Sequence, residues 1–152
     1  MRRAQQHPMR AYEAVLFDLY GTLVDDAGDA AEGALGLVQS ASGAAWGIVT
    51  SCPARLARAL LVRAGFPEPP LMIAAEDVAR SKPSPDCYRL AAARLGVSAG
   101  SCLVFEDSTH GVAAARAAGM EVVDVREAAL GGLRLCVDPV SKRLSLQTGE
   151  RG

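Results

Sequence analysis

Polar side chains that could bind a phosphate and a metal ion stand directly after short apolar runs of this 152-residue chain. These residues are Asp18, Thr50, Ser51, Glu106 and Asp107. Lys82 lies between the apolar runs 46–49 and 102–105. Carboxylates that lie close together repel unless a cation holds them, and oxygen ligands suit a hard ion such as Mg²⁺. A hydroxyl, the free N–H groups of a helix start and a lysine suit an anionic phosphate. The residue types therefore predict one site for Mg²⁺ and phosphate.

Short apolar runs alternate with helical patterns along the chain, which is typical of an α/β fold with a mainly parallel central sheet. The predicted strands are 14–17, 46–49, 71–74, 102–105 and 121–125. Most of them are rich in Val, Ile, Leu or Phe, as expected for strands that are covered on both faces. Open sheets of this kind bind ligands beyond the carboxyl ends of their strands. The polar residues above are therefore expected at one edge of the sheet.

Capping residues delimit the helices that should connect these strands. We expect one helix from a cap at Ser51 to Gly65, one from Ser84 and Pro85 to Gly96, one from Ser108 or Thr109 to Gly119, and another over about 29–41. In the second of these, Tyr88, Ala91, Ala92 and Leu95 share one face, which predicts a buried side.

The domain organisation is expected to be a single domain over 1–152, with an N-terminal arm over 1–12 and a tail over 131–152. Within the tail, apolar and polar residues alternate on both sides of Pro139, which favours a β-hairpin added at the edge of the sheet.

The composition excludes several classes of function. A formal net charge of −1 and an aromatic content of 5% give no basis for binding nucleic acid or an acidic membrane surface. The stretch 33–54 has no charged side chain, but its glycines and polar residues argue against a membrane span. The N-terminus leads into no hydrophobic signal core. Four widely spaced cysteines indicate free thiols in a reducing compartment, so we expect a cytoplasmic protein.

Taken singly, each candidate residue also has an ordinary structural explanation. Asp18 could be a turn or capping residue, Glu106 and Asp107 could be the acidic start of a helix, and Lys82 could be a solvated surface lysine. The combination is harder to explain in this way, because the groups follow separate predicted strands in an order that suits one site.

Four segments resemble the motifs of the haloacid dehalogenase-like (HAD) hydrolases. They are "FDLYGTLVD", "GIVTS", "KPSPDCY" and "FEDSTHGVAAARAAGM", and the resemblance runs from about residue 15 to 125, which is most of the chain. The last two are most similar to the sugar-phosphatase and phosphoglucomutase branch. The resemblance implies a Rossmann-like three-layer sandwich and Mg²⁺-dependent hydrolysis of a small phosphorylated substrate.

The resemblance also implies a role for each motif residue. Asp18 would attack phosphorus and form an aspartyl-phosphate intermediate. Thr50, with the Ser51 amide, would hold the transferring phosphoryl group, and Lys82 would neutralise its charge and steady the nucleophile. The implied metal ligands are the side chains of Asp18, Glu106 and Asp107 and the main-chain carbonyl of Tyr20.

Tyr20 departs from the phosphatase pattern, which has aspartate two residues after the nucleophile as the general acid and base. Tyr20 is therefore the catalytic position in doubt, because a phenol ionises only near pH 10 in water and is a poor base at neutral pH. Loss of a general acid–base costs ~10²–10⁴-fold in rate. The order D-x-Y-G-T is also the pattern of the haloacid dehalogenases, which need no metal, although that branch lacks an acidic pair such as Glu106–Asp107.

The intervals between the motifs are too short for a cap domain. Asp18 and Thr50 are 32 positions apart, as are Thr50 and Lys82, and each interval has room for little more than a helix and a strand. The site is therefore expected to be open to water, unless a second subunit of a homo-oligomer or a macromolecular substrate covers it.

Three hypotheses follow. The first is a capless HAD-like phosphatase that acts slowly through Asp18. The second is a 2-haloacid dehalogenase-like hydrolase that uses Asp18 without metal. The third is a protein that keeps the fold, binds a phosphate or a partner, and has lost turnover.

Overall fold

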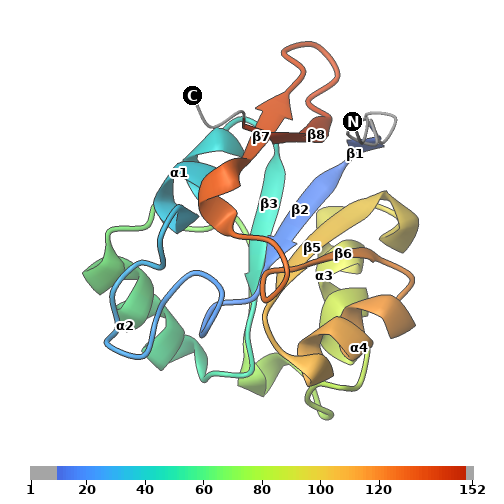
Figure 1. The fold of residues 1–152 in the computed structure, drawn as a ribbon. Coiled ribbons are helices and arrows are strands. Elements are labelled where there is room, and N and C mark those ends of the chain that lie inside the picture. The colour runs from blue at the N-terminus through green and yellow to red at the C-terminus, as the bar shows by residue number, and fades with distance from the viewer. Residues whose placement is uncertain (1–9, 150–152) are drawn as a thin grey trace.

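The computed structural model of the chain describes residues 10–149. Its centre is a five-stranded parallel sheet with the strand order β4-β3-β2-β5-β6 (Figure 1). The strands are β2 (Ala14–Phe17), β3 (Ala45–Val49), β4 (Met72–Ile73), β5 (Cys102–Glu106) and β6 (Glu121–Asp124). The expected α/β fold and all five predicted strands are confirmed.

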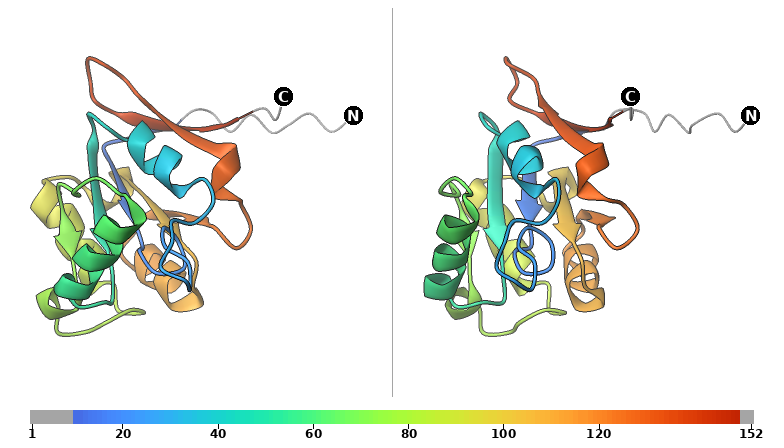
Figure 2. Two further views of the ribbon diagram at one scale, coloured as in Figure 1. Left: turned by 90° about the vertical axis from the view of Figure 1, so that its left-hand side faces the viewer. Right: turned by 60° about the vertical axis from the view of Figure 1, so that its left-hand side comes forward.

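Helices cover both faces of this sheet and make a three-layer sandwich (Figures 1 and 2). They are α1 (Ala34–Ser40), α2 (Ala54–Ala64), α3 (Asp86–Leu95) and α4 (Thr109–Ala117). Alternate residues of β2 face opposite layers, since Val15 and Phe17 pack with α1 and α2 whereas Leu16 packs with α3 and α4. Every residue of β2 and β5 is buried, which explains why these strands are continuous apolar runs.

The helix ends agree only in part with the expectations from capping. Gly65 and Gly96 end α2 and α3 in the left-handed conformation, as expected. The Ser51 cap was wrong, because α2 begins at Ala54 with Pro53 in the capping position. Helix α1 is shorter than predicted, because turns take up the chain before it and Gly33, with φ of 80°, sets its start.

The predicted tail hairpin is confirmed, but its predicted place at the edge of the central sheet is wrong. Strands β7 (Leu133–Val137) and β8 (Leu144–Thr148) pair antiparallel and join β1 (Ala11–Tyr12) in a separate sheet of order β1-β8-β7. This sheet lies near the amino ends of the central strands (Figures 1 and 2). Its apolar side chains pack into the core beside α1, and the Leu135 amide donates to Ser40 Oγ at 3.1 Å. Burial of this apolar face explains the position of the hairpin.

Short 3₁₀ turns complete the described chain: η1 (Ala75–Asp77), η2 (Ala99–Ser101) and η3 (Leu130–Gly132). The four cysteines are free thiols. Among the described residues, no helix has both the length and the apolar character needed to traverse a bilayer. The division into a single domain stays a prediction, and the parts of the predicted arm and tail at 1–9 and 150–152 lie outside the described residues.

Candidate active site

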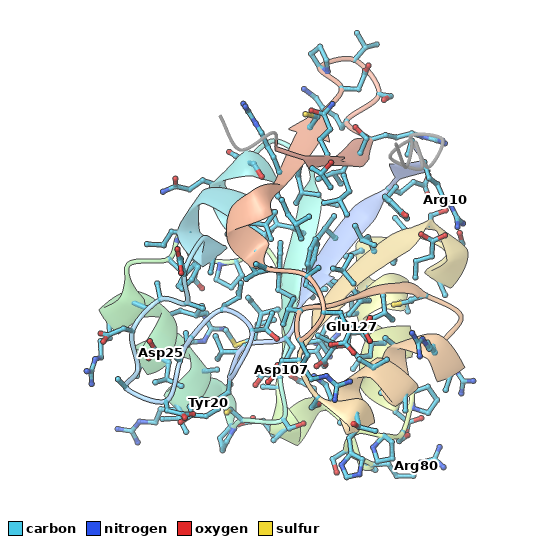
Figure 3. The ribbon with its side chains drawn as sticks, in the orientation of Figure 1. Arg10, Tyr20, Asp25, Arg80, Asp107 and Glu127 are labelled. Atoms are coloured by element: carbon cyan, nitrogen blue, oxygen red, sulfur yellow. The ribbon has the colours of Figure 1, made fainter. Side chains whose placement is uncertain are left out.

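The carboxyl ends of β2 and β5 bring three carboxylates together. Asp18, Glu106 and Asp107 each place one oxygen within 4.8 Å of the other two. Asp18 directly follows β2, and its amide donates to the Phe105 carbonyl of β5 at 3.0 Å, so the pairing of these central strands determines its position. Figure 3 shows Asp107 at this edge of the sheet. The predicted convergence of residues 18, 106 and 107 is therefore present in the fold.

Lys82 lies between these carboxylates, and its side chain is only 7% exposed. Its Nζ donates to Asp18 Oδ1 at 2.9 Å and to Glu106 Oε1 at 2.6 Å. Nζ donates a third hydrogen bond to the Val49 carbonyl at the end of β3, at 3.0 Å. An ammonium has three donors. All three are thus used within the protein, and Lys82 would act on a bound phosphate through its charge.

The electrostatics of this cluster favour a bound cation. Burial raises the pKa of Asp18, the Lys82 ammonium lowers it and the Glu106 charge raises it, with a net value of about 7. Burial alone would lower the pKa of Lys82, but the charges of Asp18 and Glu106 outweigh this and raise it. The Lys82 ammonium contacts Asp18 and Glu106, and the Arg126 guanidinium, which pairs with Asp124, acts on Asp107 through its charge. Three carboxylates gathered at one edge of the sheet suit a bound cation.

Glu106 is completely buried, and hydrogen bonds reach both of its oxygens. Oε1 accepts from the Tyr88 hydroxyl at 2.5 Å as well as from Lys82, and Oε2 accepts from the Asp107 amide at 3.2 Å. Burial and the Glu106 charge hold the pKa of Tyr88 well above its usual value, so the phenol keeps its proton. Glu106 therefore serves Lys82 as a counter-charge, whereas Asp107 has an oxygen directed toward Asp18.

Thr22 connects the other two carboxylates. Its buried hydroxyl lies 3.2 Å from Asp18 Oδ2 and 3.2 Å from Asp107 Oδ1. A hydroxyl has one proton, so it serves one of these oxygens at a time. One oxygen of Asp18 and one of Asp107 lie within 4.8 Å of each other, and a hard, oxygen-binding ion such as Mg²⁺ fits this donor set.

Gly21 lets Asp107 approach this loop. Its φ is +86°, and a Cβ at this position would lie 2.0 Å from Asp107 Oδ2. Glycine is thus required for both the backbone conformation and the space beside the carboxylate.

The predicted phosphate-binding residues lie beside Lys82 on the end of β3. Thr50 is buried, and its Oγ1 accepts from the Cys52 amide at 3.0 Å, which leaves the hydroxyl proton available to an anion. Thr50, Ser51, Ser81 and Lys82 line part of a pocket of about 150 Å³, together with small apolar side chains. Three hydroxyls and a nearby ammonium charge suit a phosphate group.

Tyr20 is the predicted site residue whose side chain stands apart. It lies on the loop after β2, and 47% of it is exposed (Figure 3). Its backbone forms a bridge to Val24. The peptide of residue 20 thus belongs to the turn beside Asp18, while about half of the residue is exposed to solvent.

The sequence did not single out Thr22, Tyr88 or Gly111 as parts of the site. Tyr88 was assigned only to a buried helix face, although a buried phenol needs a hydrogen-bond partner and could have been noticed for that reason. Thr22 and Gly111 lie within the quoted motifs, but their residue types do not indicate the contacts with Asp107 and Glu106, because these contacts join different elements.

Gly111 in α4 makes room for Glu106, and this contact yields a test. An added Cβ would lie 2.1 Å from Glu106 Cδ. We expect Gly111→Ala to lower the free energy of unfolding by roughly 1–3 kcal/mol through overpacking, measured by urea denaturation. Gly36→Ala in α1 is the control, since a Cβ there has no neighbour within 4 Å and should be neutral or stabilising. Equal stability of the two variants would contradict the tight contact.

The sequence of the chain matches the profile of a known protein family. The sequence profile described as "Hydrolase: haloacid dehalogenase-like hydrolase" matches residues 28–119, more than half of the chain. The chain belongs to the haloacid dehalogenase-like hydrolase family. The resemblance to this family is thereby confirmed; the match includes the second and third motifs and nearly all of the fourth, whereas the first motif precedes it.

Individual relatives of this HAD-like chain include phosphatases of Escherichia coli. It is 44% identical to hexitol phosphatase A over 84 residues, which are 55% of this chain and 39% of that protein. It is 45% identical to fructose-1-phosphate phosphatase YqaB over 78 residues, 51% of this chain and 42% of that protein. The matched region therefore spans about two fifths of each relative.

Solved structures of HAD proteins share the fold. A HAD family hydrolase from Deinococcus radiodurans, with bound phosphate and sodium, superposes with a TM-score of 0.69 at 23% identity, covering 73% of this chain and 79% of that one. CbbY from Rhodobacter sphaeroides, in complex with phosphate, gives a TM-score of 0.63 at 24% identity, covering 73% and 84%. These likenesses support the Rossmann-like three-layer architecture.

Proposed function

We propose that the protein is a Mg²⁺-dependent phosphatase that hydrolyses small phosphate monoesters through an aspartyl-phosphate on Asp18, and that it does so slowly. The observation that carries this proposal is the contact of Asp18 with Lys82 on one side and, through Thr22, with Asp107 on the other. Both sugar-phosphatase relatives support phosphate ester hydrolysis as the reaction.

Mg²⁺ would be held by Asp18, Asp107 and the main-chain carbonyl of Tyr20. Glu106 lies in the same cluster, but its hydrogen bonds favour a role in holding Lys82. When bound, Mg²⁺ supplies positive charge to the carboxylates and to the phosphate oxygens. The gathered carboxylates and the oxygen-only donors described above are what fit this ion.

The residues of the chain would then divide the work of phosphoryl transfer. An Asp18 oxygen forms a bond to phosphorus while the bond from phosphorus to the ester oxygen breaks, and the departing oxygen takes a proton from solvent water. Thr50 donates to a phosphoryl oxygen, and the Lys82 charge opposes the negative charge of the group. Water then attacks phosphorus, releases inorganic phosphate and restores the Asp18 carboxylate.

The phosphatase relatives support a small phosphorylated substrate, such as a sugar phosphate, and the short intervals between the motifs leave the site to be covered by a second subunit. Between Asp18 and Thr50 the described chain holds turns, α1 and β3, and between Thr50 and Lys82 it holds α2, β4 and η1. Neither interval contains a separate cap. We propose that the chain works as one capless domain.

One observation favours a second candidate. Tyr20 gives the loop the D-x-Y-G-T order of the haloacid dehalogenases, so carbon–halogen hydrolysis by Asp18 without metal is the alternative activity. If neither activity exists, the site would serve only to bind a phosphate or a partner.

Wild-type protein assayed in parallel tests these alternatives. We expect release of p-nitrophenol from p-nitrophenyl phosphate with Mg²⁺, and at least a tenfold lower rate with EDTA, because the carboxylate charge would then repel the phosphate. Release of halide from 2-chloropropionate in EDTA would instead establish the dehalogenase. Absence of both activities, with Mg²⁺ binding detected by calorimetry, would leave the binding role.

A further inference from the structure

Tyr88 is the buried side chain next to the site whose hydroxyl the proposed reaction leaves without a role. It belongs to α3, is 0% exposed, and donates to Glu106 Oε1 at 2.5 Å. The same oxygen accepts from Lys82 at 2.6 Å. A single carboxylate oxygen therefore receives two strong donors, one of which touches the proposed nucleophile.

The ring of Tyr88 also lies under the ammonium. Lys82 Nζ is 5.2 Å from the centre of the ring, within the range of a cation–π contact. Tyr88 therefore limits the position of the ammonium with its ring and the direction of the Glu106 carboxylate with its hydroxyl. Two constraints from one side chain are more than burial in a helix core requires.

The geometry points to Tyr88 as a positioning residue that orients Lys82 through Glu106 and thereby aligns Asp18. The chain of contacts runs from the Tyr88 hydroxyl to Glu106 Oε1, to Lys82 Nζ and to Asp18 Oδ1, and every member is buried. Inside a protein, such linked hydrogen bonds reinforce one another because the surroundings are poorly polarisable.

Glu106 needs this second donor because its position is otherwise only partly defined. Its Oε2 accepts the Asp107 amide at 3.2 Å, a longer bond than either bond to Oε1. Gly111 leaves the space that the carboxylate occupies, as the close approach of a Cβ there shows. Loss of the phenol hydroxyl would let the carboxylate rotate, and Lys82 would follow its acceptor.

Tyr88→Phe isolates this effect, because it keeps the ring and removes only the hydroxyl. The matched control is Tyr12→Phe in β1, which removes the hydroxyl of another buried tyrosine; this hydroxyl bonds to Glu121 in a partly buried contact near the opposite end of the sheet. Each variant deletes one oxygen atom and one hydrogen bond to a carboxylate. Thermal melting of both proteins checks that they remain folded.

The chain offers a direct spectroscopic view of the ammonium, because it contains just two lysines, Lys82 and Lys142. Lys142 is exposed in the β7–β8 turn. In protein labelled with ¹⁵N-lysine, the buried ammonium of Lys82 should exchange its protons slowly and give a signal distinct from that of Lys142. We expect Tyr88→Phe to shift or broaden the Lys82 signal alone, and Tyr12→Phe to leave both signals unchanged.

The kinetic readout rests on the proposed function. With p-nitrophenyl phosphate and Mg²⁺, Tyr88→Phe should lower kcat about tenfold, as the loss of a hydrogen bond to a charged group implies, and keep KM within about twofold. Tyr12→Phe should keep both constants. A lower kcat with a nearly unchanged KM is not expected from a loss of stability alone.

The two readouts separate the two claims. A Lys82 signal that is identical in wild type and Tyr88→Phe overturns the positioning role, whether or not the protein is a phosphatase. A shifted Lys82 signal in a protein without any turnover supports the positioning role and refutes the proposed activity. An equal loss of kcat in Tyr88→Phe and Tyr12→Phe also counts against a specific role.

Discussion

Asp18→Asn is expected to abolish phosphate release, with a loss of at least about a thousandfold, and to leave a folded protein. The amide has nearly the shape of the carboxylate but cannot attack phosphorus, and removal of a covalent nucleophile has effects of this order or larger. Release of p-nitrophenol in the presence of Mg²⁺ measures the loss. Retention of more than about a tenth of the activity would refute the aspartyl-phosphate mechanism.

The same substitution should also change how stability depends on pH. The pKa of Asp18 is about 7 in the folded protein and near 4 when unfolded, so the folded state holds more protons between these values. Its protonated form therefore stabilises the fold fully below about pH 4, and this contribution is lost as the pH rises through about 7. The metal-free wild type should be less stable at pH 8 than at pH 5 on account of this group.

Asp18→Asn should remove that contribution, because an amide carries no charge at either pH. Melting temperatures measured in EDTA at pH 5 and pH 8 test this expectation. Between pH 5 and pH 8, the melting temperature of the variant should rise relative to that of the wild type. Added Mg²⁺ should stabilise the wild type at pH 8 and have a weaker effect on the variant. If the variant is less stable than the wild type at pH 8 without metal, burial of the Asp18 charge does not destabilise the fold.

The strands and the edge that carries the site could be predicted from the sequence for a simple physical reason. Strands buried on both faces must be continuous apolar runs, and β2 and β5 have no exposed residue. Because the strands are parallel, the residues that follow them meet at one edge. From this rule alone, Asp18, Glu106 and Asp107 are predicted to lie close together.

Features that depend on contacts between distant elements could not be predicted in this way. The hairpin β7–β8 alternates apolar and polar residues whether it joins the central sheet or packs beside α1, so its pattern predicts pairing and not position. Ser51 is a good capping residue, but the chain bends at Ser51 and Cys52, and the helix begins only after Pro53. The three acceptors around Lys82 come from three different strand ends, and only the folded chain shows that they use all its donors.

Tyr20→Asp is expected to raise phosphatase activity by at least tenfold. The variant would place a carboxyl group two residues after the nucleophile, where it can protonate the departing alcohol and then take a proton from water. General acid–base catalysis contributes ~10²–10⁴-fold. Tyr20 is 47% exposed, so the shorter side chain gives up contacts that are only partly buried. Inorganic phosphate release from p-nitrophenyl phosphate and from a sugar phosphate measures the gain.

The gain should depend on the leaving group, and this dependence identifies its cause. An alkoxide that leaves from a sugar phosphate needs a proton far more than p-nitrophenolate does, so the sugar phosphate should gain more. Tyr20→Asn is the control, because it has the size of the aspartate but no proton to exchange at neutral pH. An equal increase in both variants would show that removal of the phenol, rather than acid–base chemistry, released the activity. If neither variant is more active than the wild type, the openness of the site, and not Tyr20, limits turnover. In an open site, water competes with every polar contact that the substrate makes.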